Sequence, residues 1–148
     1  MAAQREPRWL SRMVVDAIHS DQVREHGGLP AVRDENALES ALARPRQKWH
    51  DEPKTTIPAL AAAYAFGLVR NHPYRDGNKR IGFLAMATFL GINGYAFEAT
   101  DADVVTQFVA LAAGDVKEDQ LAAWIQTHSR RPRATARQAG TRRDRREV

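Results

Sequence analysis

Apolar residues along most of the chain recur every three to four positions, which is the period of an amphipathic α-helix. This spacing predicts helices over residues 9–26, 34–45, 56–71, 79–92, 100–114 and 117–128. The alternation typical of a β-strand is scarce, and residues 95–97 are the best short candidate. The pattern therefore predicts an all-α fold, with residues 1–129 forming one domain.

Polar residues and proline mark where the predicted helices begin and end. Asp34, Thr56 and Thr100 each precede a periodic segment and are typical N-caps. Pro45 is predicted to end the second helix, because a proline inside a helix removes a backbone hydrogen bond. The following stretch, residues 46–55, is polar and irregular in pattern.

The segment 79–92 is apolar on nearly every side, which is typical of a buried, central helix. Two histidines of the first helix, His19 and His26, are seven residues apart and hence two turns, or roughly 10 Å, apart on one face. One metal ion cannot bridge that distance, so we expect ordinary surface histidines. The tryptophans are expected to be packing anchors.

The overall composition fits a globular protein of one core. Hydrophobic residues make up 43% of the 148 positions, and the absence of cysteine excludes a disulfide framework and a thiolate metal site. No apolar run approaches the ~20 residues that span a bilayer, and the N-terminus lacks the apolar stretch of a signal peptide. We expect a cytoplasmic protein with no membrane partner.

Positive charge is concentrated at the C-terminus. The whole chain carries +4, while residues 130–148 carry +6, from eight arginines against Asp144 and Glu147; residues 1–129 therefore carry −2. The segment 130–148 has too little apolar bulk to form a core, so we expect a disordered basic tail. Any binding of nucleic acid should be indirect or depend on this tail.

The loop between the third and fourth predicted helices combines several kinds of polar residue. In order it reads His72, Pro73, Tyr74, Arg75, Asp76, Gly77, Asn78, Lys79, Arg80. Gly77 lets the backbone approach a ligand closely, and a helix that begins near Asn78 offers unpaired N–H groups to an anion. The cations of Lys79 and Arg80 add to that attraction. These features indicate a polyphosphate site.

The same loop also contains a carboxylate and an imidazole. Asp76 beside bound phosphates calls for an intervening cation, and Mg²⁺ readily binds one carboxylate together with phosphate oxygens. His72 could act as a general base toward an attacking hydroxyl. Taken singly, each residue has a plainer reading, as a helix cap, a turn residue or a solvated charge. Their combination ahead of an apolar helix favours a functional site.

These nine residues resemble the signature of the Fic/Doc superfamily, His-Pro-Phe-x-Asp/Glu-Gly-Asn-Gly/Lys-Arg, with Tyr74 at the usual Phe position. The upstream stretches 27–34 and 38–45 are similar to the death-on-curing (Doc) branch. The likeness covers about residues 10–128. It implies a compact helical fold with the motif loop ahead of a buried central helix.

The resemblance also implies roles for individual residues. His72 would be the general base, and Asp76 the Mg²⁺ ligand. The phosphates of the co-substrate ATP would be held by a set of neighbours: Gly77, Asn78, Lys79 and Arg80. Residues 46–55 would cover the cleft and align the target.

The adenylylating branch typically reads Gly-Asn-Gly-Arg-x-x-Arg, whereas this chain has Lys79 at the second glycine and Phe83 at the last arginine. The Doc branch transfers the γ-phosphate of ATP to a protein hydroxyl, and the implied target is a threonine of elongation factor Tu, which would arrest translation. We therefore favour a kinase. Two alternatives stay open: a Fic-type adenylyltransferase, and a non-catalytic DNA- or repressor-binding module.

Many Fic proteins contain an inhibitory helix with the pattern Ser/Thr-x-x-x-Glu-Gly/Asn. The single Glu followed by Gly or Asn here is Glu35, and the residue four positions earlier is Ala31. The pattern therefore fails, and we expect inhibition to come from a separate chain, the antitoxin of a toxin–antitoxin pair.

Overall fold

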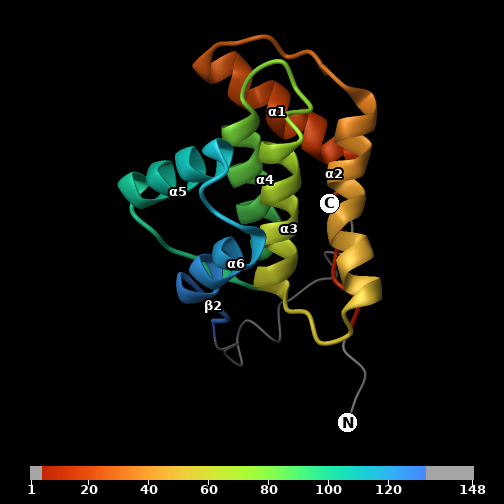
Figure 1. The fold of residues 1–148 in the computed structure, drawn as a ribbon, viewed down its shortest axis with the longest axis vertical. Helices are drawn as coiled ribbons and strands as arrows, with labels where there is room; N and C mark the ends of the chain where they lie inside the picture. The colour runs from red at the N-terminus through yellow and green to blue at the C-terminus, as the bar shows by residue number, and fades with distance from the viewer. Residues whose placement is uncertain (1–4, 133–148) are drawn as a thin grey trace, which may run out of the picture.

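The computed structural model describes residues 5–132, which form six helices and two short strands (Figure 1). The helices are α1 (Arg12–His26), α2 (Glu35–Asp51), α3 (Ile57–Arg70), α4 (Asn78–Ile92), α5 (Asp101–Ala113) and α6 (Glu118–Thr127). The strands β1 (Ala96–Phe97) and β2 (Ser129–Arg130) pair antiparallel. The predicted all-α fold is confirmed, as is the short strand within residues 95–97.

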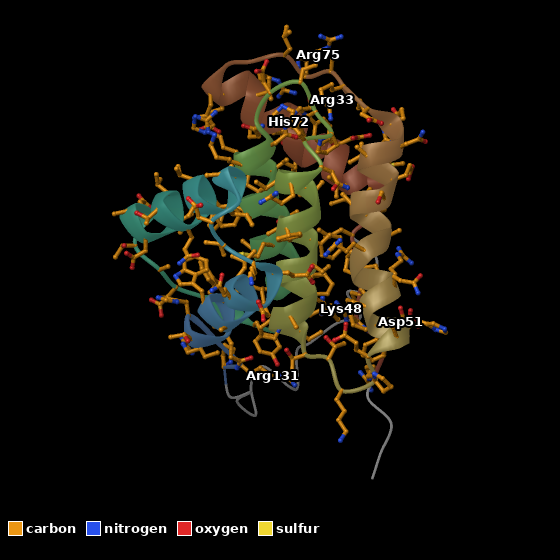
Figure 2. The ribbon with its side chains drawn as sticks, viewed as in Figure 1. Arg33, Lys48, Asp51, His72, Arg75 and Arg131 are labelled. Carbon is orange, nitrogen blue, oxygen red and sulfur yellow. The ribbon has the colours of Figure 1, made fainter. Side chains whose placement is uncertain are left out.

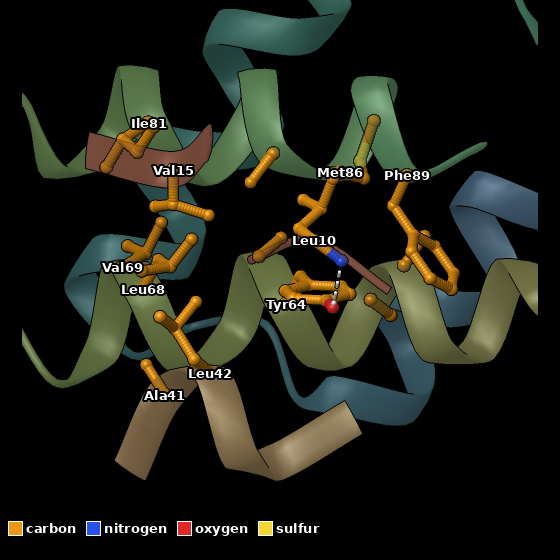
Figure 3. Packing of buried hydrophobic residues seen from close by; sticks show 14 of the residues in the cluster. Leu10, Val15, Ala41, Leu42, Tyr64, Leu68, Val69, Ile81, Met86 and Phe89 are labelled. Carbon is orange, nitrogen blue, oxygen red and sulfur yellow. Dashed lines mark hydrogen bonds between the residues drawn. The ribbon is translucent and has the colours of Figure 1, made fainter. Parts of the chain in front are cut away.

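The core forms around α3, which packs against α2 on one side and against α4, α5 and α6 on the others (Figure 1). Small residues, Ala61 to Ala63 and Ala65, are fully buried along α3 and let these neighbours approach closely. Figure 3 shows larger side chains, among them Leu68, Ile81 and Met86, filling the space between α3 and α4. The predicted buried helix, α4, thus shares the centre of the molecule with α3.

Helix α2 continues for six residues beyond Pro45, so the prediction that Pro45 ends it is wrong. Pro45 lies on the same face as Leu38 and Leu42 and is buried with them, so its ring adds to the core although its nitrogen cannot donate a hydrogen bond. Beyond it, Lys48 pairs with Glu118 of α6 at 3.6 Å. Tertiary packing therefore outweighs the local effect of the proline.

The predicted helix caps are confirmed. Thr56 Oγ1 accepts a hydrogen bond from the Ala59 N–H group, and Asp34 and Thr100 cap α2 and α5 in the same way. The tryptophans are partly buried against the core, as expected of packing anchors.

The last described residues contact the segment that follows α4. Arg130 belongs to β2, opposite Ala96, and the guanidinium of Arg131 lies 5.6 Å from the centre of the Tyr95 ring. Residues 133–148, which make up most of the predicted disordered tail, lie outside the described residues. Within residues 5–132 no helix is both long enough and apolar enough to cross a membrane.

Candidate active site

The six residues predicted to form the site line one cleft of about 760 Å³, between the motif loop, the first turn of α4 and helix α5. They are His72, Asp76, Gly77, Asn78, Lys79 and Arg80. Figure 2 shows His72 and Arg75 at the end of the helical bundle where α1 crosses it. Two other hollows, of about 570 and 670 Å³, lie beside Lys48 and Glu118 and include none of the six.

The N-terminus of α4 opens into this cleft without a side-chain cap. Gly77 occupies the N-cap position in the left-handed conformation, and the first helical hydrogen bond runs from Ile81 N–H to Gly77 O. The N–H groups of the first turn therefore have no partner within the helix. The side chains of Lys79 and Arg80 are exposed next to them. Together these groups form a site suited to an anion.

His72 has an exposed side chain and an unusual backbone. Its φ of 51° makes it the one non-glycine residue with positive φ in the described part of the chain. Such a conformation is costly and persists where neighbours enforce it. Arg33 does so, because its Nε donates to the His72 carbonyl at 2.7 Å and its Nη2 donates to the Asn71 carbonyl at 3.1 Å.

Asn78 is buried and connects the two halves of the motif loop. Its Oδ1 accepts from Tyr74 N–H at 3.0 Å, and its Nδ2 donates to the Tyr74 carbonyl at 2.9 Å and lies 3.0 Å from His72 Nδ1. The side-chain amide thus holds the loop and the His72 ring in place. Its backbone N–H belongs to the open first turn of α4, and the predicted contact with phosphate stays a prediction.

Asp76 is exposed, with one carboxylate oxygen held by the loop that follows α1. Its Oδ2 accepts from Leu29 N–H at 2.8 Å. A Cβ at Gly28 would lie 2.9 Å from the Asp76 Cβ, so this approach requires glycine. Residues 5–132 contain no group of three or more acidic, histidine or cysteine side chains that could hold a metal alone. One carboxylate fits a Mg²⁺ ion that also binds phosphate oxygens and water.

Helix α1 supports the motif loop with two buried polar residues, His19 and Gln22. His19 is 1% exposed, stacks on the Tyr74 ring at 3.6 Å, and donates from Nε2 to the Asp76 carbonyl at 2.8 Å. Gln22 Nε2 lies 3.4 Å from the Gly77 carbonyl. The expectation of a surface position for His19 is therefore wrong. The signal was in the sequence: the polar residues His19 and Gln22 share the face of α1 that also contains buried valines.

Tyr74 is anchored to α1 through its hydroxyl group, which donates to Asp16 Oδ1 at 2.6 Å. Burial of the ring, together with the Asp16 carboxylate, raises the pKa of Tyr74. The phenol therefore stays protonated and remains a donor. Tyrosine in place of the usual phenylalanine thus gains a polar attachment while keeping the packing role.

The segment that covers the motif loop is the connection between α1 and α2. Val32 and Tyr74 form an isolated antiparallel bridge, with Arg33 N–H donating to Pro73 O at 2.8 Å and Arg75 N–H donating to Ala31 O at 2.9 Å. The prediction that residues 46–55 cover the cleft is wrong. Residues 46–51 form the end of α2 and residues 52–55 follow it, at the opposite end of the bundle, where Figure 2 shows Lys48 and Asp51.

The far wall of the cleft is apolar and belongs largely to α5. Val105 and Val109 are 62% and 53% exposed there. Phe83, at the position of the last arginine in the adenylylating pattern, lines the cleft and packs edge-on against Phe108 at 5.7 Å. This wall can therefore contact apolar groups of a ligand. Position 83 supplies no cation to a phosphate group.

Sequence comparison places these features in a known family. Residues 9–90, more than half of the chain, match the model of the Fic/DOC family. The chain is 27% identical over 116 residues to the protein kinase doc of Escherichia phage P1, covering 78% of this chain and 90% of that protein. It is 43% identical over 81 residues to the toxin Doc of Mycolicibacterium smegmatis, covering 53% of this chain and 60% of that protein.

The matched region includes the whole motif loop, the uncapped start of α4 and the α1–α2 connection that covers the loop. The expected resemblance to the Doc branch is confirmed by the two relatives. This chain is a member of the Fic/DOC family, of the Doc type.

Proposed function

We propose that this chain is the toxin of a toxin–antitoxin pair, and that it transfers the γ-phosphate of ATP to a threonine or serine hydroxyl of a protein target. The observation that carries the proposal is the cleft itself. An exposed imidazole, a carboxylate and an uncapped helix N-terminus with two flanking cations all line one space large enough for a nucleotide. The name of the relative from phage P1, a protein kinase, supports the same reaction.

In this reaction the triphosphate lies against the first turn of α4. The N–H groups of that turn and the side chains of Lys79 and Arg80 neutralise the charge of the transferred phosphoryl group. His72 takes the proton of the target hydroxyl as its oxygen forms a bond to the γ-phosphorus. The bond from that phosphorus to the β–γ bridging oxygen breaks, and ADP leaves with the electron pair.

Asp76 is the residue that would hold Mg²⁺. When bound, the ion supplies charge neutralisation to the phosphate oxygens. The Leu29 N–H and His19 contacts fix both the side chain and the backbone of Asp76, so that its carboxylate stays at the edge of the cleft. These two contacts therefore hold the Asp76 carboxylate, the one protein ligand proposed for the ion, in a defined position.

The preference for transfer of the γ-phosphate over transfer of AMP rests on the resemblance to the Doc branch. The adenylylating pattern has a phosphate-binding arginine at the position that Phe83 occupies here. Phe83 is instead part of an aromatic cluster with Phe97 and Phe108. Lys79, at the position of the second glycine of that pattern, adds its positive charge at the start of α4.

The proposed partners are a protein substrate and an inhibitor. By the resemblance to the Doc branch, the substrate is elongation factor Tu, and its phosphorylation would arrest translation. The inhibitor is an antitoxin on a separate chain, because the inhibitory-helix pattern fails at residues 31–36. The similarity of this chain to the toxin Doc of M. smegmatis supports the proposed toxin role.

Incubation with elongation factor Tu, Mg²⁺ and ATP labelled in either the α- or the γ-phosphate tests the reaction. We expect label on the factor from γ-labelled ATP alone. His72→Ala should lower the rate by about 100-fold or more, the usual contribution of a general base. The matched control is His50→Ala, an exposed histidine near the end of α2 far from the cleft.

Each contrary result points to a different error. Label from the α-phosphate would show adenylyl transfer. No label on the factor, combined with label on another protein of a cell extract, would replace the target and keep the reaction. Full activity of His72→Ala would remove the imidazole from the mechanism. Salt-dependent DNA binding that is lost with residues 130–148, in a protein without transferase activity, would favour the binding-module alternative.

A further inference from the structure

The orientation of the Asn78 side-chain amide is fixed by the backbone of Tyr74. The Tyr74 N–H can only donate, and it points to Asn78 Oδ1 at 3.0 Å. The Tyr74 carbonyl can only accept, and it lies 2.9 Å from Asn78 Nδ2. Exchanging the amide oxygen and nitrogen would break both bonds at a residue that is 5% exposed. The nitrogen therefore faces His72.

This orientation determines which nitrogen of the His72 ring carries the proton. An amide nitrogen is a donor without an accepting lone pair, so at 3.0 Å the His72 Nδ1 must accept its hydrogen. A neutral imidazole holds one proton, which must then be on Nε2. Arg33 holds the His72 carbonyl and the backbone at positive φ, and the contact with Asn78 then orients the ring.

A general base needs a free lone pair on the nitrogen that meets the substrate hydroxyl. In this arrangement Nδ1 is occupied by Asn78, and Nε2 carries a hydrogen. We propose that Asn78 is a positioning residue that keeps His72 in this inactive tautomer, and that His72 becomes a base when the amide leaves Nδ1 and the ring proton moves there. The part of this proposal that concerns the base rests on the proposed function.

The nucleotide itself is the group that competes for the amide. Both hydrogens of Asn78 Nδ2 are engaged, one by the Tyr74 carbonyl and one by His72 Nδ1. A phosphate oxygen at the start of α4 is a charged acceptor and forms a stronger hydrogen bond than a neutral ring nitrogen. When a phosphate takes the second hydrogen, Nδ1 is released. Binding of the co-substrate would thereby activate the base, and His72 would be unable to act as a base in the enzyme without nucleotide.

The position of the ring proton can be measured without any nucleotide. In uniformly ¹⁵N-labelled protein, at a pH where the imidazole is neutral, long-range ¹H–¹⁵N correlations show which ring nitrogen is protonated, and His72→Gln identifies the signals. We expect wild-type His72 to be protonated on Nε2. In Asn78→Asp the side chain can only accept, so the proton should move to Nδ1. In Asn78→Ala the preference for Nε2 should fall by roughly fivefold, the effect of one hydrogen bond.

Asn93 provides a matched control, because its side chain also makes three hydrogen bonds, to Arg8 N–H, Arg8 O and Phe89 O. Asn93→Asp disturbs a comparable set of bonds and should leave the His72 proton on Nε2. Protonation of Nδ1 in the wild type would overturn the proposal. So would an unchanged Nε2 proton in Asn78→Asp and Asn78→Ala, provided that the backbone amide signals of the loop show a folded protein.

A second arm tests release by the nucleotide. With Mg²⁺ and an ATP analogue that cannot be hydrolysed between its β- and γ-phosphates, the Nδ1-protonated form should increase. If the analogue shifts the amide signals of Lys79 and Arg80 while the ring proton stays on Nε2, release by nucleotide is wrong and the proposed function survives. If the analogue does not bind, the proposed function and the release both fail. The tautomer measured in the free protein is judged independently of either result.

Discussion

The two ends of helix α4 are built from the same parts. At its N-terminus stand Gly77 and Asn78, and at its C-terminus stand Asn93 and Gly94, with a glycine at positive φ in both places. Each asparagine uses its Oδ1 to accept a backbone N–H and its Nδ2 to donate to a backbone carbonyl. A buried tyrosine packs near each end, Tyr74 at the first and Tyr64 at the second.

The two ends differ in where the second amide hydrogen goes. Asn93 donates it to the Phe89 carbonyl, inside the helix. Asn78 directs it to the ring of His72, and the first turn of α4 is left without a side-chain cap. At the C-terminus of α4 the second amide hydrogen is therefore used within the helix. The N-terminus leaves backbone N–H donors accessible from the cleft. Asn93 therefore contributes to stability alone, whereas Asn78 contributes to stability and also contacts the proposed general base.

The largest effect should separate the two asparagines. Asn78→Ala leaves the buried Tyr74 N–H and carbonyl without partners, which should cost about 3 kcal/mol of unfolding free energy. Asn93→Ala should cost less, about 1–2 kcal/mol, because Arg8 is only half-buried and water can replace the lost bonds. Urea denaturation of both variants measures the difference. A larger loss in Asn93→Ala than in Asn78→Ala would contradict it.

The next effect concerns the two glycines. A Cβ at Gly77 would lie 2.1 Å from Gln22 Nε2, while a Cβ at Gly94 would meet nothing within 4 Å. Gly94→Ala should therefore cost about 1 kcal/mol, for a side chain at positive φ alone. Gly77→Ala should cost about 2 kcal/mol, because the end of the Gln22 side chain must also move.

The same pair can be tested in a Gln22→Ala background. There the obstruction is gone, and Gly77→Ala should cost about the same as Gly94→Ala, about 1 kcal/mol. Equilibrium denaturation of the wild type, Gln22→Ala, Gly77→Ala and the double variant completes this double-mutant cycle. A cost for Gly77→Ala that does not change when Gln22 is shortened would show that the backbone conformation, and not the side-chain contact, sets the requirement for glycine.

The sequence predicted the helices and the motif because both are local. Caps such as Thr56 act within one turn, and the nine residues from His72 to Arg80 are consecutive. The errors concern contacts between distant segments. Pro45 stays within a helix because of its burial, and His19 is buried because the motif loop lies 57 residues away in the chain but against it in space. No local pattern reports such contacts.

The cover of the motif loop was missed for the same reason. The bridge between Val32 and Tyr74 depends on how the α1–α2 connection folds back over the start of α4. Arg33 belongs to the stretch 27–34 that resembles the Doc branch, but nothing local in the sequence indicates that it contacts the backbone of His72. The polar residues His19 and Gln22, which share the buried face of α1 with Val15 and Val23, offer a further signal that a polar loop packs there.

The smallest effect should separate the two tyrosines at high pH. Burial raises the pKa of both, and the Asp16 carboxylate raises that of Tyr74 further, whereas the Leu10 N–H opposes the rise at Tyr64 (Figure 3). The folded state therefore keeps its phenol protons above about pH 10, where the unfolded chain loses them. Stability is complete below that pH and falls as pH rises above it.

Tyr74→Phe should lose about 1 kcal/mol at neutral pH, the net value of its hydrogen bond to Asp16. Above about pH 10 the variant should lose stability less steeply than the wild type, by about 1.4 kcal/mol for each pH unit, because one proton fewer distinguishes the two states. Tyr64→Phe should reduce the slope over a narrower range, since its pKa is raised with opposing contributions. Urea denaturation from about pH 9 to pH 11 measures both slopes. An unchanged slope in Tyr74→Phe would mean that the Tyr74 hydroxyl has the same pKa in the folded and unfolded states. The phenol beside the cleft would then not be buried as described.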